Sequence, residues 1–177
     1  MPTDSGGYQV FSLAALRKIH ENGVRFRSHI DGSAHEFTPE NVVEKPRTIG
    51  ADVMMVLDEC PPYPSTEEYC TRSNELTVAW AQRCKKAWHD QPPLYGYEQA
   101  LFAIVQGGVY PHLRQLSTNQ LVEIDFPGYA IGGLAVGEPV DLLYEMTGIV
   151  TDILPQEKPR YLMGVGKPEN LVECVHL

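Results

Sequence analysis

The chain has 177 residues, of which 43% are hydrophobic and 21% are charged, a composition typical of one soluble globular domain. It contains no run of about 18 apolar residues, so the sequence predicts no membrane span. Its first residues lack the layout of a signal peptide. The formal net charge of −9 argues against a nucleic-acid partner, because phosphate binding requires Lys and Arg side chains.

The sequence contains four cysteines, Cys60, Cys70, Cys84 and Cys174. Their separations match no C-x-x-C metal-binding pattern, and nothing in the sequence indicates secretion. We therefore expect free thiols in a cytoplasmic protein, with no metal or cofactor site built from this chain.

The first recognisable element is a β-hairpin. Val24, Phe26, Ser28 and Ile30 alternate with polar residues up to the turn signal Asp31-Gly32. Residues 35–37 then supply the return strand. We interpret this hairpin as an insertion in the fold that follows.

Four strand-then-helix units follow. The predicted strands cover residues 51–57, 101–105, 129–131 and 160–163. A capping box of Ser65 and Glu68 opens the first helix, whose apolar side carries Tyr69, Leu76, Trp80, Cys84 and Ala87. The later helices are predicted at about 111–124, at about 140–154 and from Pro168 onward.

The strands are nearly all apolar, as in a parallel sheet that is buried on both faces. The sequence therefore predicts one α/β domain over residues 1–177. Right-handed crossovers are compatible with either a doubly wound sheet or a barrel.

Polar residues and glycines follow each strand, at the edge where parallel α/β folds carry their chemistry. A carboxylate such as Asp58 can accept two N–H groups from guanine, and Gln106 offers both a donor and an acceptor. Gly133 allows close approach of the backbone, and Tyr8 can stack on a ring. Each residue alone also fits an ordinary cap, turn or loop contact. Together they indicate a purine pocket.

Six strings, read in order, resemble the tRNA-guanine transglycosylase family along the whole chain. They occupy residues 4–10, 28–33, 58–64, 105–108, 132–138 and 161–168. The resemblance implies a partial TIM (β/α)8 barrel with a β-hairpin insertion. It also implies that an Asp nucleophile attacks C1′ of the anticodon wobble guanosine, so that a 7-deazaguanine replaces guanine in tRNA.

The resemblance also implies roles for individual residues. Asp4 is the acid/base group, Asp58, Gln106 and Gly133 hold the base edge, and Tyr8 and Met163 contact its faces. The remaining base-pocket residues by this resemblance are Ser5, Gly6, Gly7, Cys60, Leu134, Val136 and Glu138. The tRNA contact is formed by Gly164, Val165, Gly166, Lys167, Pro168, Glu169 and Asn170.

The sequence departs from the family pattern in several places. It ends just before the G-I-D-M-F-D-C-type string that carries the nucleophile and before the zinc ligands, three Cys and one His. It also begins within the loop that holds Asp4, so the first barrel strand is expected to be missing. We therefore expect an incomplete barrel domain that is inactive alone, with the structural zinc and the homodimer belonging to the full-length family protein. Pro46 is expected to end or kink a helix.

Two residues indicate which base is inserted. Val136 stands where queuine-using members have Gly, and Cys60 follows Asp58-Glu59 as in bacterial members. Both favour the smaller precursor preQ1. Two alternatives remain open: a non-catalytic tRNA-binding paralogue or partner subunit, and a TIM-barrel enzyme that acts on a small phosphorylated substrate.

Overall fold

A computed structural model describes residues 2–4, 6 and 17–177 of the chain. Its larger sheet has five parallel strands in the order β1-β5-β6-β7-β8. The strands are β1 (Pro2–Thr3), β5 (Val53–Met55), β6 (Ala100–Val105), β7 (Gly128–Ile131) and β8 (Arg160–Leu162). Each strand pairs with the one before it in the sheet, and the order never reverses. This is the winding of a TIM barrel rather than of a doubly wound sheet, so the expected partial barrel is confirmed.

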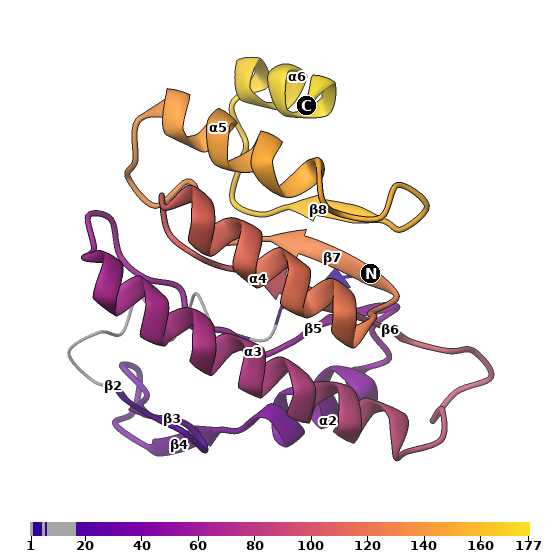
Figure 1. Ribbon diagram of the computed structural model, residues 1–177. Coiled ribbons are helices and arrows are strands. Elements are labelled where there is room, and N and C mark those ends of the chain that lie inside the picture. Colours follow the sequence, from indigo (N-terminus) through magenta and orange to yellow (C-terminus); the bar gives the residue numbers. More distant parts are fainter. Residues whose placement is uncertain (1, 5, 7–16) are drawn as a thin grey trace.

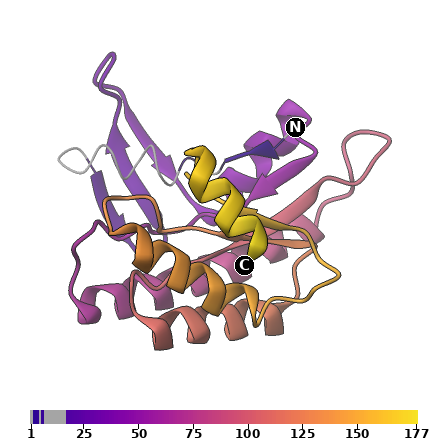
Figure 2. The same ribbon diagram turned by 90° about the horizontal axis from the view of Figure 1, so that it is seen from above.

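The helices pack against one another in chain order. They are α2 (Pro39–Ile49), α3 (Glu67–His89), α4 (Pro111–Ile124), α5 (Val140–Thr151) and α6 (Pro168–His176). Figures 1 and 2 show α3, α4 and α5 side by side on one face of the parallel sheet. All residues of β7 and all but the first of β6 are buried, which explains their nearly continuous apolar sequence.

The predicted hairpin belongs to a second, antiparallel sheet of three strands, in the order β2-β3-β4. These are β2 (Arg17–His20), β3 (Gly23–Arg27) and β4 (Ala34–Phe37). The predicted hairpin is confirmed as β3 and β4. Strand β2 was not predicted from the sequence. Strand β3 ends before Ile30 because the backbone turns at Ser28, whose N–H donates to Ser33 O at 2.9 Å.

Two local predictions are wrong, and a third is wrong in part. Pro2 and Thr3 form a short strand paired with Val53 and Met54, although the first strand was expected to be missing. Helix α3 is capped by Thr66, whose Oγ1 accepts from Tyr69 N, because the Ser65 hydroxyl instead donates to Pro62 O. Pro46 lies inside α2 and does not end it, and the kink that was expected as the alternative stays a prediction. The helix continues to Ile49 and closes at Gly50, which has the left-handed φ of 84°.

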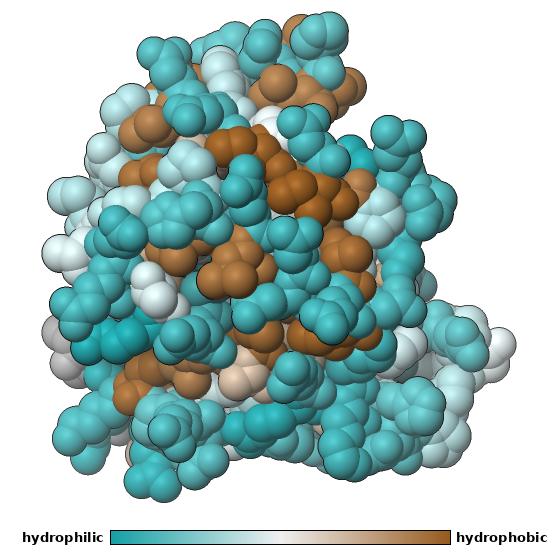
Figure 3. All heavy atoms as spheres, in the orientation of Figure 1, coloured by the Kyte–Doolittle hydropathy of each residue, from teal (hydrophilic) through white to brown (hydrophobic). Residues whose placement is uncertain are grey.

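The surface of the helical layer is mostly hydrophilic, and Figure 3 shows hydrophobic side chains gathered in the upper part of this face, around α5. The last helix, α6, has no buried residue, and Val172 and Val175 are 73% and 87% exposed. Within the described residues, no helix combines the length and apolar character needed to cross a membrane.

Candidate base-binding site

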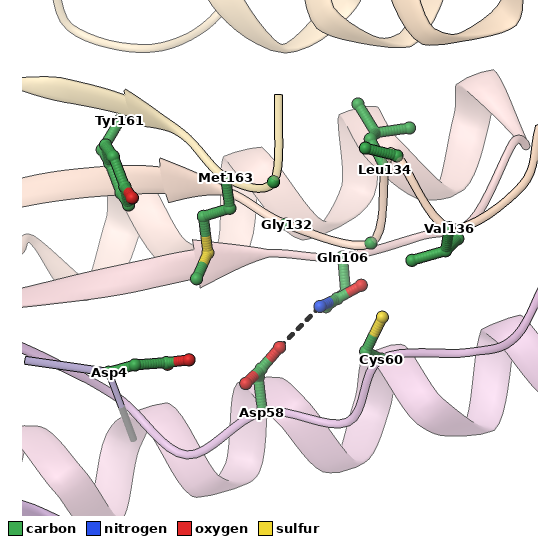
Figure 4. Close-up of a pocket in the computed structure, with 12 residues that line it drawn as sticks. Asp4, Asp58, Cys60, Gln106, Gly132, Leu134, Val136, Tyr161 and Met163 are labelled. Atoms are coloured by element: carbon green, nitrogen blue, oxygen red, sulfur yellow. Dashed lines mark hydrogen bonds between the residues drawn. The ribbon is translucent and has the colours of Figure 1, made fainter. Parts of the chain in front are cut away.

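The carboxyl ends of the parallel strands surround one cavity of about 400 Å³. Its walls are formed by Asp4, Asp58, Cys60, Gln106, Gly132, Gly133, Leu134, Ala135, Val136, Tyr161, Met163 and Gly164. Figure 4 shows the side chains of Asp4, Asp58, Gln106 and Met163 pointing into the space between the loops. The sheet therefore brings together residues that are far apart in the sequence, as the rule for parallel strands predicts.

Asp58 and Gln106 form a buried polar pair in this cavity. Gln106 Nε2 donates to Asp58 Oδ2 at 2.6 Å, and the two residues are 1% and 8% exposed, respectively. Gln106 Oε1 has no hydrogen-bond partner among the described residues. Because unpaired buried acceptors are costly, this oxygen and the second carboxylate oxygen of Asp58 are suited to a ligand with N–H donors.

Burial and neighbouring charge alter the acidity of two groups in the cavity. The pKa of Asp58 is raised to about 7, mainly by burial and then by the negative charge of Asp4, while the hydrogen bond from Gln106 opposes the rise. Burial also raises the pKa of the Cys60 thiol to about 12. Cys60 is therefore a neutral thiol at physiological pH, and it is not equipped to act as a nucleophile.

A polar stripe on α3 holds the loop that carries Asp58. Glu59 N donates to Thr77 Oγ1 at 3.0 Å, and Ser73 Oγ donates to Glu59 O at 3.0 Å. The Tyr69 hydroxyl donates to the Glu59 carboxylate. These contacts explain why α3 buries Ser73 and Thr77 as well as its apolar residues. Apolar periodicity alone does not identify such positions.

The loop after β7 requires glycine at two consecutive positions. Gly133 has a φ of +63°, and a Cβ atom there would lie 2.1 Å from Gln106 Oε1. A Cβ atom at Gly132 would lie 2.6 Å from Ile104 Cγ2. Close packing against β6 and Gln106 therefore fixes both residues as glycine.

Arg114 is a site residue that the sequence does not reveal. This α4 side chain is fully buried beneath the cavity and donates only to backbone carbonyls. Its acceptors are Gly108 O at 2.7 Å, Val105 O at 3.3 Å, Gly132 O at 2.6 Å and Gly133 O at 3.0 Å. Burial lowers its pKa to about 10, so the guanidinium stays protonated near neutral pH. The available sequence signal was its helical spacing from the buried positions Ser117, Thr118 and Leu121.

Glu138 supports the same loop from outside the cavity. Its carboxylate accepts from Ala135 N at 2.5 Å and from Val136 N at 2.9 Å. Ala135 has a φ of 59°, which is unusual for a residue with a side chain. The two hydrogen bonds compensate for this local strain and fix the direction of both peptides.

The structure brings most of the predicted base-pocket residues together. The cavity contains Asp4, Asp58, Cys60, Gln106, Gly133, Leu134, Val136 and Met163, and it adds Gly132, Ala135 and Tyr161. Gly6 does not line it, because this residue lies against the Phe37 ring. Ser5, Gly7 and Tyr8 lie outside the described residues.

The predicted tRNA-contact stretch lies beside this cavity. A neighbouring hollow of about 560 Å³ is lined by Gly164, Val165, Gly166, Lys167, Glu169 and Asn170, together with residues of the 135–144 segment. Ala135 and Gly164 border both spaces. The Tyr144 hydroxyl anchors the stretch by donating to Asn170 Oδ1 at 2.9 Å.

The four cysteines are free, and three of them are buried. In the part of the chain that the structure describes, no group of three or more His, Cys, Asp or Glu side chains is arranged to hold a metal ion. These residues therefore do not fit the structural zinc that the resemblance implies, and no chemistry of this site is assigned to a metal.

Comparison with known proteins identifies the family. The family model described as queuine tRNA-ribosyltransferase matches residues 1–177. A protein of that name from Caldanaerobacter subterraneus subsp. tengcongensis is 60% identical over 173 residues, which are 98% of this chain and 45% of the relative. One from Thermoanaerobacter sp. (strain X514) is 56% identical over 173 residues, again 98% of this chain and 45% of the relative. One from Ruminiclostridium cellulolyticum is 55% identical over 171 residues, 97% of this chain and 44% of the relative. The chain thus spans less than half the length of these relatives, and it belongs to the queuine tRNA-ribosyltransferase family.

Proposed function

We propose that this chain forms the base-binding part of a tRNA-guanine transglycosylase that exchanges the wobble guanine of tRNA for preQ1. The observation that carries the proposal is the Asp58–Gln106 pair beside Gly133, in a cavity at the carboxyl ends of the strands. The free carboxylate oxygen accepts from the N1–H and 2-amino group of guanine. The second N–H of the Gln106 amide and the peptide N–H of Gly133 can donate to its O6.

Asp4 enters the cavity from the end of β1, opposite Gln106 (Figure 4). In the proposed reaction a carboxylate nucleophile attacks C1′, and the bond from C1′ to the base nitrogen breaks. Asp4 moves the proton that the leaving base gains and the incoming base loses. By the family resemblance, the nucleophile is an Asp outside the strings found here.

The loop after β7 offers an acceptor for the aminomethyl group of preQ1. Ala135 N–H donates to Glu138, so the carbonyl of Leu134 in the same trans peptide points away from Glu138. Leu134 O lies 3.6 Å from the Cβ position of Gly164, on the wall that faces β8. A cationic amine bound to this carbonyl would also be attracted by the carboxylate behind the peptide.

Val136 is expected to set the choice between preQ1 and queuine. Its side chain lines the cavity, and queuine carries a bulky cyclopentenediol where preQ1 ends in an amine. The exchange activity and the choice between preQ1 and queuine can be tested together in a completed enzyme. In this enzyme, the chain replaces the matching segment of the Caldanaerobacter relative. The unmodified enzyme should exchange labelled guanine and preQ1 into tRNA but use queuine poorly.

Val136→Gly should admit queuine and leave guanine exchange nearly unchanged, because overpacking strain of about 1–3 kcal/mol is relieved only for the larger base. Absence of any exchange in the unmodified enzyme would instead favour a non-catalytic tRNA-binding paralogue. Equal use of queuine and preQ1 before the substitution would contradict the role of Val136.

The small sheet supplies positive charge for RNA despite the net charge of −9. Lys18 pairs with Arg25 across β2 and β3, and Arg27 follows on the same face two residues later. All three are exposed. Arg25 is partly neutralised by Glu36 at 3.1 Å, whereas Lys18 has no ion pair among the described residues. We propose that this face contacts tRNA phosphates.

Lys18→Glu and Arg27→Glu should each weaken tRNA binding by the completed enzyme. Each should also flatten the dependence of log affinity on log salt concentration by about one unit, as loss of a phosphate contact does. Lys86→Glu is the matched control, because Lys86 is an exposed lysine of α3, outside the small sheet, and it is already paired with Asp90. Binding titrations at several salt concentrations give the slopes. A Lys86 variant that lost as much slope as the others would show a general charge effect.

A further inference from the structure

Two consecutive peptides in the wall of the cavity are oriented by Arg114. Its guanidinium donates to Gly132 O at 2.6 Å and to Gly133 O at 3.0 Å. In a trans peptide the N–H points opposite to the carbonyl. The N–H groups of Gly133 and Leu134 therefore point away from Arg114, and both residues line the cavity.

Neither N–H group has an acceptor among the described residues. Leu134 is only 4% exposed and Gly133 is partly exposed, and Figure 4 shows the Leu134 side chain directed away from Asp58 and Gln106. Buried peptide N–H groups are almost always satisfied, by protein, water or ligand. This pair therefore forms a donor site for an acceptor in the cavity.

The positive charge that contacts the carbonyl side of these two peptides, on Arg114, has an unusual environment. Arg114 is fully buried, and within the described residues it forms no salt bridge and donates only to neutral carbonyl groups. A cation that bonds to a peptide carbonyl polarises that peptide and strengthens its N–H as a donor. Two N–H donors in the cavity wall, polarised by a buried cation on their far side, resemble the arrangement that stabilises an oxyanion.

We propose that Arg114 is a positioning residue that polarises the N–H groups of Gly133 and Leu134, which stabilise negative charge on the base during exchange. The inference rests on the proposed function. When the bond from C1′ to the base nitrogen breaks, its electron pair stays on the base and spreads over the ring to O6. The bond from the nucleophile carboxylate to C1′ forms at the same time, and the charge on the base is cancelled when it gains a proton.

The test compares two incoming bases, guanine and the more acidic 8-azaguanine, in the completed enzyme. Arg114→Met should lower kcat/KM for incoming guanine at least tenfold. This constant reports the step in which the incoming base attacks C1′ and displaces the carboxylate, and it excludes the departure of the tRNA guanine that both reactions share. The loss should be several-fold smaller for 8-azaguanine, because a more acidic ring needs less stabilisation as an anion. Arg114→Lys keeps the charge and should recover part of the guanine rate.

Leu121→Ala is the matched control for stability, because Leu121 is fully buried on the same helix and makes no contact with the Gly132–Gly133 carbonyls. It should lower the thermal midpoint without changing the ratio of the two rates. An unchanged ratio in Arg114→Met would reduce Arg114 to a packing residue and overturn the inference.

Binding measurements keep the inference testable if Arg114→Met fails to fold or if the unmodified enzyme shows no exchange. The dissociation constants of the two bases, measured for the unmodified protein and for Arg114→Lys at a pH where 8-azaguanine is partly ionised, should show the greater loss for 8-azaguanine, because the polarised N–H groups favour the anion that this more acidic base forms. Equal losses for the two bases would overturn the inference. Absence of exchange in the unmodified enzyme, in contrast, contradicts the proposed function and not the donor pair.

Discussion

Asp58→Asn is expected to weaken guanine and preQ1 binding by the completed enzyme about ten- to a hundredfold. In the proposed complex Asp58 presents a carboxylate oxygen to the N–H pair of the base, while its other oxygen accepts from Gln106 at 2.6 Å. In the variant an amide NH₂ replaces one of these acceptors, so that a donor faces a donor. An unpaired buried polar group costs about 1–3 kcal/mol, which corresponds to this loss of affinity.

The same residue should make base binding depend on pH. In the empty cavity the pKa of Asp58 is raised to about 7 by burial and by the charges of Asp4 and Glu59. The N–H groups of a bound base favour the carboxylate, so binding lowers this pKa. Affinity should therefore be greatest above about pH 7 and fall by up to tenfold per unit as the pH drops below 7, until the pKa of the complex is reached.

Calorimetric titration of guanine between about pH 5 and pH 8 measures both effects. In Asp58→Asn the affinity should be low and nearly independent of pH. Glu59→Gln is the matched control: its carboxylate is held by Tyr69 outside the cavity, and its removal should only move the pH midpoint downward. An unchanged dissociation constant in Asp58→Asn would show that Asp58 is a loop residue.

The parallel half of the fold follows from the sequence because both faces of its strands are buried. The apolar runs at β6 and β7 therefore stand out, and α4 begins and ends at the predicted residues. Strand β1 does not stand out, because two residues carry no periodicity and only their pairing with Val53 and Met54 defines the strand. The cap of α3 differs by one residue because Ser65 and Thr66 are both good capping residues. The tertiary contact of Ser65 with Pro62 decides between them.

The residues of the candidate site could also be predicted only in part from the sequence. The rule that chemistry lies at the carboxyl ends of parallel strands identifies Asp58, Gln106 and Gly133, which meet in one cavity. It does not identify Arg114, because an arginine in an amphipathic helix normally lies on the surface. Its burial depends on carbonyl groups supplied by two separate loops. The fold brings these hydrogen-bond acceptors of Arg114 together, and no local pattern in the sequence indicates them.

Gly133→Ala is expected to abolish measurable base binding and to lower the stability of the protein. The added Cβ would lie 2.1 Å from Gln106 Oε1, and the left-handed φ of +63° would be strained for alanine. Relief requires either displacement of the Gln106 amide, which breaks its bond to Asp58, or movement of the Gly133 peptide away from Arg114. Both movements dismantle the base site, and the strained conformation itself costs about 1 kcal/mol.

Gly137→Ala is the matched control, because it introduces backbone strain without a steric clash. Gly137 also has a positive φ, +121°, but its Cβ would meet nothing within 4 Å. This variant should lose stability through backbone strain and still bind guanine within about threefold of the unmodified enzyme, since a change below about 1 kcal/mol is expected at a residue that does not touch the base. Thermal midpoints and guanine dissociation constants of both variants make the comparison. If Gly133→Ala bound guanine as well as Gly137→Ala does, the contact between Gly133 and Gln106 would not shape the pocket. The base edge would then have to be recognised by Asp58 without the ordered amide beside it.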